Sequence, residues 1–119
     1  MSRESKDARI YVNPKSVLLA ACRFSGVPVA AILGNGRHAR VVRARRLYAA
    51  ACRVCSLASY AEIGAAIDGR GHSCIRQMLR WVDRVEANPA LDLDFFTDVY
   101  HVVALSKIGR EEAKDGKPC

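Results

Sequence analysis

The fold of this chain is decided by the stretch SYAEIGAAIDGRGHSCIR, residues 59–76. Ser59 and Glu62 stand three residues apart, ahead of apolar residues, and this spacing is typical of the capping box that begins a helix. The apolar residues that follow recur at helical spacing, so the sequence predicts a short helix over residues 59–67. Gly69 marks the end of this helix, because glycine commonly follows the last helical residue.

A second and longer helix follows a turn that contains Gly69 and Gly71. We predict it over residues 72–87, because Asn88-Pro89 disfavours its continuation. Its apolar stripe consists of Ile75, Met78, Leu79, Val82 and Val85. Two helices joined by a short, glycine-containing turn form a helix-turn-helix.

The rest of the chain also has helical patterns. They cover residues 11–26, 28–34, 40–56 and 91–107, and a basic loop, NGRHAR, occupies residues 35–40. Asn13 is a favourable N-cap for the first of these helices, and Pro14 suits its first position. No segment shows the alternation of a strand ladder. The sequence therefore predicts an all-α, multi-helix domain over residues 10–106, between a flexible leader (1–9) and a flexible tail (107–119).

Two of these helices carry specific expectations for the core. In the helix over residues 40–56, the inward residues are expected to be Val42, Leu47, Ala50, Ala51 and Val54, with the arginines on its other faces. In the helix over residues 91–107, the packed residues are expected to be Phe95, Val99, Val102 and Val103. Acidic residues fall in the first turn of that helix, where the helix dipole favours them.

The charge of the chain is positive and unevenly distributed. There are 19 Lys and Arg against 12 Asp and Glu, a net charge of +7. No acid occurs from Ala8 to Ala61, a segment rich in arginine, whereas residues 83–98 are acidic with Arg84 as their one base. A clustered basic surface is typical of a protein that binds a polyanion, most often nucleic acid. The alternative is that the positive charge serves only solubility.

Several protein classes are disfavoured by composition. No apolar run reaches the roughly 18–20 residues that cross a bilayer, and the polar start of the chain lacks the apolar core of a secretory signal. The five cysteines are odd in number and lie in helical sequence, which argues against a disulfide scaffold. We therefore expect a cytoplasmic protein with reduced thiols and no membrane partner.

Three patterns that resemble reactive or ligand sites are weak. Cys52 and Cys55 form a lone CxxC motif, whereas a structural zinc site needs four ligands, so we expect both to be core residues. His72 cannot pair with Ser73 or Cys74 as a nucleophilic dyad, because neighbouring helical residues point about 100° apart. The GRG segment lacks the phosphate-loop patterns, and no strand precedes it.

We therefore expect no enzyme activity, no metal, no cofactor and no nucleotide ligand. A zinc- or thiol-dependent sensor that uses Cys52 and Cys55, together with Cys22 or Cys74, stays an alternative.

A helix-turn-helix also offers a binding function. In DNA-binding members its second helix lies in the major groove, with its N-terminal residues at the base edges. Here those residues are His72, Ser73 and Arg76, whose side chains can hydrogen-bond to bases. The N–H groups at the start of the same helix can bind phosphate. The favoured ligand is therefore double-stranded DNA.

The segment EIGAAIDGRGHSCI, residues 62–75, resembles the signature of the C-terminal DNA-binding domain (domain IV) of the bacterial chromosomal replication initiator DnaA. The resemblance extends without gaps from about Val17 to Val85 and includes the basic loop and the long helix that follows it. It implies a Trp-repressor-like helical domain, here as a stand-alone protein. The implied function is binding of duplex DNA in replication initiation, in its regulation or in transcription control.

The resemblance also implies roles for individual residues. Arg37 corresponds to an arginine that enters the minor groove, and His72 and Ser73 correspond to residues that read bases in the major groove. It implies phosphate contacts for Arg43, Arg45 and Arg53. It implies contacts with the DNA backbone for Ser59 and Tyr60, and contact with a thymine methyl group for Ala61. The full set of expected DNA-binding residues is Arg37, Arg40, Arg43, Arg45, Arg53, Ser59, Tyr60, Ala61, Arg70, Gly71, His72, Ser73 and Arg76.

The sequence departs from the family pattern at the start of the recognition helix. Gly71 stands where the family has an aspartate that accepts a hydrogen bond from a cytosine amino group. Cys74 replaces a threonine, and Arg76 replaces an apolar residue. Losing a good base contact costs about 1–3 kcal/mol of discrimination, whereas an added arginine raises affinity through phosphate without adding specificity.

These departures keep a second function open. The alternative is a protein-interaction module that kept the initiator fold but docks on another protein. The chain also has no P-loop, so we expect that it does not melt an origin by ATP-driven assembly by itself. The target sequence, and a protein partner in replication or transcription, stay open at this point.

Overall fold

Helices make up most of the chain that the structure describes. The computed structural model describes residues 12–116, with side chains as far as residue 108. Its elements are α2 (Pro14–Ser25), α3 (Val29–Leu33), α4 (Ala39–Cys55), α5 (Tyr60–Ala65), α6 (His72–Ala87), the 3-10 turn η1 (Pro89–Leu91) and α7 (Phe95–Gly116). Residues 12–116 contain no strand, and the all-α fold class is confirmed.

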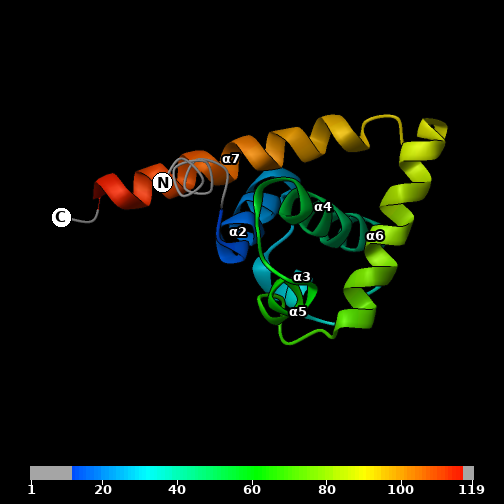
Figure 1. Cartoon of the computed structure of the whole chain (residues 1–119), viewed down its shortest axis with the longest axis horizontal. Coiled ribbons are helices and arrows are strands. Elements are labelled where there is room, and N and C mark those ends of the chain that lie inside the picture. The colour runs from blue at the N-terminus through cyan, green and yellow to red at the C-terminus, as the bar shows by residue number, and fades with distance from the viewer. Residues whose placement is uncertain (1–11, 117–119) are drawn as a thin grey trace.

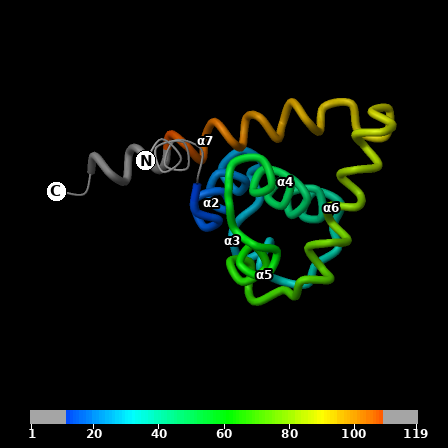
Figure 2. The backbone as a smooth tube through the Cα atoms, viewed as in Figure 1, coloured from blue at the N-terminus to red at the C-terminus, as the bar shows by residue number. Residues whose placement is uncertain are grey.

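Helix α4 is the centre of the arrangement (Figure 1). Helices α2 and α7 pack against it and against each other, α6 packs against it separately, and α5 packs against α6. The tube in Figure 2 shows the chain passing from α5 through a turn into α6, which ends near the start of α7. The buried apolar residues form one continuous core, whose largest members are Tyr48, Phe95, Ile32, Leu47, Ile63, Ile67 and Ile75.

The capping signals in the sequence are confirmed in detail. The Asn13 side chain accepts a hydrogen bond from the Lys15 N–H at 2.9 Å, and Pro14 is the first residue of α2. Gly26 ends that helix in the left-handed conformation, with φ of 77°, which glycine adopts without strain. The short helix expected at residues 28–34 is α3.

Two expectations for α4 are wrong. Leu47 and its neighbours Ala50 and Ala51 are buried as predicted, but Val54 is 54% exposed and Arg45 is only 7% exposed. The arginines of α4 therefore do not all lie on its outer faces. Apolar periodicity cannot identify a buried charge whose hydrogen-bond partners lie in another segment, and Arg45 finds its partners outside α4.

The connection from α6 to α7 also differs from the prediction. Helix α6 has the predicted bounds, but residues 89–91 form η1, and α7 begins at Phe95 instead of residue 91. Asp92 and Asp94 therefore precede α7, and Asp98 is the acid of its first turn. The four predicted packing residues of α7 are buried: Phe95, Val99, Val102 and Val103.

The ends of the predicted domain are only partly described. Helix α7 continues to Gly116, beyond residue 107, where the sequence places the start of a tail. The predicted leader (1–9) and the last residues of the predicted tail (117–119) lie outside the described residues. The division into leader, domain and tail stays a prediction. Among the described helices, none is both long enough and apolar enough to cross a membrane.

Candidate nucleic-acid interface

The turn between α5 and α6 is made by two residues with left-handed backbone conformation. Asp68 has a φ of 69° and Gly69 a φ of 71°. Glycine adopts this conformation freely, and aspartate is among the few other residues that visit it. The capping box at the start of α5 is also present, since Ser59 Oγ accepts from the Glu62 N–H (3.2 Å) and Glu62 Oε1 accepts from the Ser59 N–H (2.8 Å).

Gly64 lets α5 approach the turn closely. A Cβ atom at this position would overlap the carbonyl oxygen of Arg70. The absence of a side chain leaves room for the Arg70 N–H to donate to the Gly64 carbonyl at 3.0 Å. Gly64 is the glycine of the EIG segment, and its structural role is to fix the backbone just before α6.

The first turn of α6 is exposed and has no side-chain cap. Gly71 is the N-cap residue with extended backbone, and no side chain accepts a hydrogen bond from the first N–H groups of the helix. His72, Ser73 and Arg76 are all exposed. The start of α6 therefore presents backbone donors and three polar side chains to the outside.

The start of α5 lies beside the start of α6. The rings of Tyr60 and His72 are 5.1 Å apart between centroids. Ser59 and Ala61 are exposed and Tyr60 is half-buried. The structure thus brings together the residues that the sequence placed at the beginnings of the two helices.

Two exposed arginines lie in the basic loop and at the start of α4. Arg37 is exposed in the loop before α4. His38 caps α4, because its Nδ1 accepts from the Arg40 N–H at 3.3 Å. Arg40 is already within the helix, and its Nη2 donates to the Ser25 carbonyl at 3.2 Å. The predicted loop 35–40 is therefore shorter, with Ala39 and Arg40 in α4.

The resemblance implies a phosphate contact for Arg45, but in the structure its guanidinium is hydrogen-bonded within the protein. Its guanidinium is buried and donates to the carbonyls of Ile32 (2.9 Å) and Gly36 (2.7 Å), among others. Burial, followed by repulsion from Arg70, lowers the Arg45 pKa. Arg70 is half-buried, and its Nη2 donates to the Gly34 carbonyl. Both arginines thus point at the backbone around α3.

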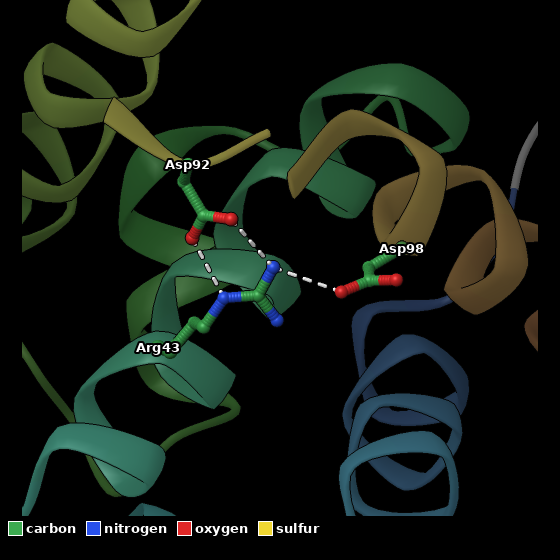
Figure 3. Close-up of polar contacts among 3 residues, drawn as sticks. All are labelled: Arg43, Asp92 and Asp98. Carbon is green, nitrogen blue, oxygen red and sulfur yellow. Dashed lines mark hydrogen bonds and ion pairs between the residues drawn. The ribbon is translucent and has the colours of Figure 1, made fainter. Parts of the chain in front are cut away.

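Arg43 is likewise occupied within the protein (Figure 3). Its Nε and Nη2 donate to the two carboxylate oxygens of Asp92 at 2.7 and 3.0 Å, and Nη2 lies 2.8 Å from Asp98 Oδ2. Hydrogen bonding to Asp92 is the main cause that raises the Arg43 pKa, and the same bond lowers the Asp92 pKa. Two carboxylates therefore already neutralise the charge of this arginine within the protein.

Acidic side chains from residues 83–98 therefore form ion pairs with arginines of α4. Besides the Arg43 cluster, Arg53 pairs with Asp83 at 3.0 Å, in an exposed ion pair. Exposed pairs of this kind contribute little stability. The two oppositely charged parts of the sequence are thus not two separate ends, because acids from α6 and α7 compensate some arginines of α4.

Two arginines that the sequence interpretation left out belong to the same region. Arg80 is exposed one turn after Arg76 on α6, and this four-residue spacing, which places both on one helix face, could have identified it. Arg46 lies over the Trp81 ring at 4.2 Å from its centroid. Nothing in the sequence alone indicates this cation–π contact between α4 and α6.

The cysteine motif lies in the core. Cys52 and Cys55 are buried, as expected for small core residues, and burial raises the pKa of both thiols. Within the described residues no three His, Cys, Asp or Glu side chains gather as a metal site would require. Cys74 is half-buried beside Arg45, Arg46 and Arg70, which line the same hollow of about 200 Å³ between α4 and α6.

Known proteins match this chain in sequence. Residues 14–82, more than half of the chain, match the family described as "Bacterial dnaA protein helix-turn-helix". The chain is 31% identical over 101 residues to the chromosomal replication initiator protein DnaA of Thermomicrobium roseum. That match covers 85% of the chain and 21% of the relative, so the chain spans about a fifth of that protein's length. No solved structure gives a significant match. The chain therefore belongs to the family of the bacterial DnaA helix-turn-helix domain.

Proposed function

We propose that this chain binds double-stranded DNA, with the first turn of α6 in the major groove and the loop of residues 34–38 in the minor groove. One observation carries the proposal. Arg70, two residues before α6, is hydrogen-bonded to Gly34 at the base of the loop, so both elements belong to one connected surface. Its exposed cations are Arg37, Arg40, Arg76 and Arg80. The family and the name of the matched relative support a role in replication initiation or its regulation; transcription control is the other role of this kind.

The residues of this surface divide by the contact that each can make. His72 and Ser73 are exposed at the start of α6, where side chains of a recognition helix reach base edges. Arg76 and Arg80 continue along the same helix and suit phosphates. Arg37 reaches from the loop towards the minor groove. Arg43 and Arg45 are excluded from this surface, because aspartates and backbone carbonyls already occupy them.

Salt-dependent binding tests the proposal. Fluorescence anisotropy with random and initiator-box duplexes, across a salt series, should show affinity that falls steeply as salt rises, because bound arginines release counterions from DNA. The double variant Arg37→Ala/Arg76→Ala should bind more weakly on every duplex, with a salt slope reduced by about one for each phosphate that is no longer bound. Arg45 is left intact in this test, since a substitution there removes buried hydrogen bonds as well as charge.

The control removes the same charge elsewhere. Arg84 and Lys107 are exposed, and Arg84 lies in the last turn of α6, at the opposite end from the recognition residues. Arg84→Ala/Lys107→Ala should therefore retain most of the affinity. Binding that ignores salt, or equal losses in both double variants, contradicts the proposed surface. A protein that binds no duplex at low salt favours the alternative, a module that docks on another protein.

A further inference from the structure

The carbonyl end of α3 faces two guanidinium groups that come from other parts of the chain. From α4, Arg45 donates to four carbonyls: Ile32 (2.9 Å), Gly36 (2.7 Å), Ala31 (3.1 Å) and Gly34 (2.6 Å). From the turn before α6, Arg70 Nη2 donates to Ile32 and Leu33, at 3.4 Å each, and to Gly34. The two arginines together contact every residue from Ala31 to Gly34, and Gly36 in the loop.

This arrangement gives hydrogen-bond partners to helix-end and loop carbonyls, among which the Ala31 carbonyl also accepts from the Gly34 N–H at 3.3 Å. The last four carbonyls of any helix have no intrahelical donor, and α3 is only five residues long. Positive charge is also favoured at the negative end of a helix dipole. The charged side chain of Arg45 is buried. Burying a charge costs free energy unless the charged group is hydrogen-bonded. The loop backbone and the two guanidinium groups therefore hold one another in place.

The position of Arg70 connects this arrangement to the recognition helix. Its backbone N–H is fixed by the Gly64 carbonyl, and the next residue, Gly71, is the N-cap of α6. Its side chain reaches the base of the loop that presents Arg37. One residue thus joins the first turn of α6 to the loop, while Arg45 joins the same loop to α4.

We propose that Arg45 and Arg70 are positioning residues, which fix the loop of residues 34–38 so that Arg37 is held ready for the minor groove while the start of α6 occupies the major groove. The inference rests on the proposed DNA binding and assigns these arginines to the loop instead of to phosphate. A loop that must be ordered on binding weakens affinity by roughly 5- to 30-fold for each residue that is fully ordered. The loss on removing Arg70 should therefore act through Arg37.

The first experiment needs no DNA. Arg70→Met keeps an unbranched apolar side chain but removes the N–H donors of the guanidinium. Arg70→Lys keeps the positive charge but lacks the planar guanidinium, whose several N–H groups can contact several carbonyls at once. Amide hydrogen exchange and backbone ¹⁵N relaxation should show increased mobility at residues 34–38 in both variants, and no change in Arg80→Lys. Unchanged loop order in a folded Arg70 variant, with circular dichroism as the check on folding, overturns the proposal whatever the protein binds.

The second experiment measures whether the protein recognises the minor groove. The duplex is one selected from a random pool, with an A·T pair replaced by inosine·C or by G·C. Inosine lacks the guanine amino group, so I·C keeps an A·T-like minor groove while its major groove resembles G·C. The wild type should bind the I·C duplex more tightly than the G·C duplex. Arg37→Ala and Arg70→Met should each lose this preference.

A double-mutant cycle of Arg70 and Arg37 distinguishes positioning of the loop by Arg70 from a direct contact of Arg70 with phosphate. If Arg70 acts through Arg37, the double variant should bind no more weakly than the weaker single variant. Arg70→Lys, which preserves the net charge, should resemble Arg70→Met in its I·C preference. Additive losses, or full binding by Arg70→Lys, would show that Arg70 is an independent phosphate contact. If the wild type binds no duplex, the proposed function fails, and the loop measurements still decide whether Arg70 holds the loop.

Discussion

Gly71 is the residue at which this chain departs most informatively from its family. It caps α6 without a side-chain hydrogen bond, and a Cβ added there would meet no atom within 4 Å. The backbone is extended, so a residue with a side chain fits without strain. The glycine is therefore not required by the fold, and we expect the missing carboxylate to change DNA recognition.

Replacing Gly71 by aspartate should strengthen both the helix cap and base discrimination. The Gly71→Asp variant should be more stable by a few tenths of a kcal/mol, because an N-cap carboxylate can accept from the first N–H groups of α6. It should also gain discrimination of about 1–3 kcal/mol for a cytosine at one position of the initiator box. Thermal denaturation and binding to box duplexes with single changes measure the two effects.

The matched control is Gly71→Ala, which adds a Cβ but no acceptor. It should gain neither the cap nor the discrimination. If Gly71→Asp binds the box no better than Gly71→Ala, the first turn of α6 does not read bases in the way that its family resemblance implies.

At the level of elements, the helix-turn-helix depends on the close approach of α5 to the turn. The capping box sets where α5 begins, and Asp68 and Gly69 reverse the chain with left-handed backbone. Gly64 removes the obstacle to the contact with Arg70. The local signals and the tertiary contact agree here, which explains why the sequence placed this motif accurately.

A side chain at Gly64 should separate the two parts of the motif. Gly64→Ala places a methyl group against the backbone of Arg70, and backbone cannot rotate away as a flexible side chain can. We expect a loss of unfolding free energy of about 1–3 kcal/mol, as for other overpacked sites. Chemical denaturation measures it. Gly36→Ala, at a position with open space around the added Cβ, should change stability by no more than about 0.5 kcal/mol. Equal effects of the two variants would falsify the role assigned to Gly64.

At the level of the whole molecule, the Arg43 cluster ties α7 to α4. Asp92 precedes α7 and Asp98 lies in its first turn, and both contact one guanidinium from α4 (Figure 3). The side chains of this cluster are between 18% and 32% exposed, so solvent screens them less than the exposed Arg53–Asp83 pair. The cluster thus joins α4 to the segment that leads into α7.

This cluster should make stability fall in acid. The pKa of Asp92 is lower in the folded protein than its ordinary value, so the unfolded state binds a proton first as pH falls. The stability from Asp92 is therefore fully present above the ordinary aspartate pKa, near 4, and is lost as pH falls through the lower folded pKa. At neutral pH, Asp92→Asn should be less stable by about 1.5–3 kcal/mol, the usual range for a hydrogen bond to a charged group.

Urea denaturation at a series of pH values tests this. The difference between the wild type and Asp92→Asn should shrink below pH about 4. Asp83→Asn, which removes an exposed partner of Arg53, should differ from the wild type by less than about 1 kcal/mol at any pH. A constant difference for Asp92→Asn down to low pH would show that the carboxylate charge contributes nothing.

The sequence by itself determined the order of the helices, the caps of α2 and α5, and the helix-turn-helix. These features depend on neighbours within a few residues, as with Asn13 at α2, Ser59 and Glu62 at α5, and Gly69 in the turn. It also placed His72, Ser73 and Arg37 on exposed positions. The partners and exposure of the other arginines were decided only by the tertiary structure. Whether Arg43, Arg45 or Arg70 faces solvent, an aspartate or a carbonyl depends on segments that lie from 9 to 49 residues away in the chain. A charged side chain is buried only where such distant partners converge, and no local pattern records that convergence.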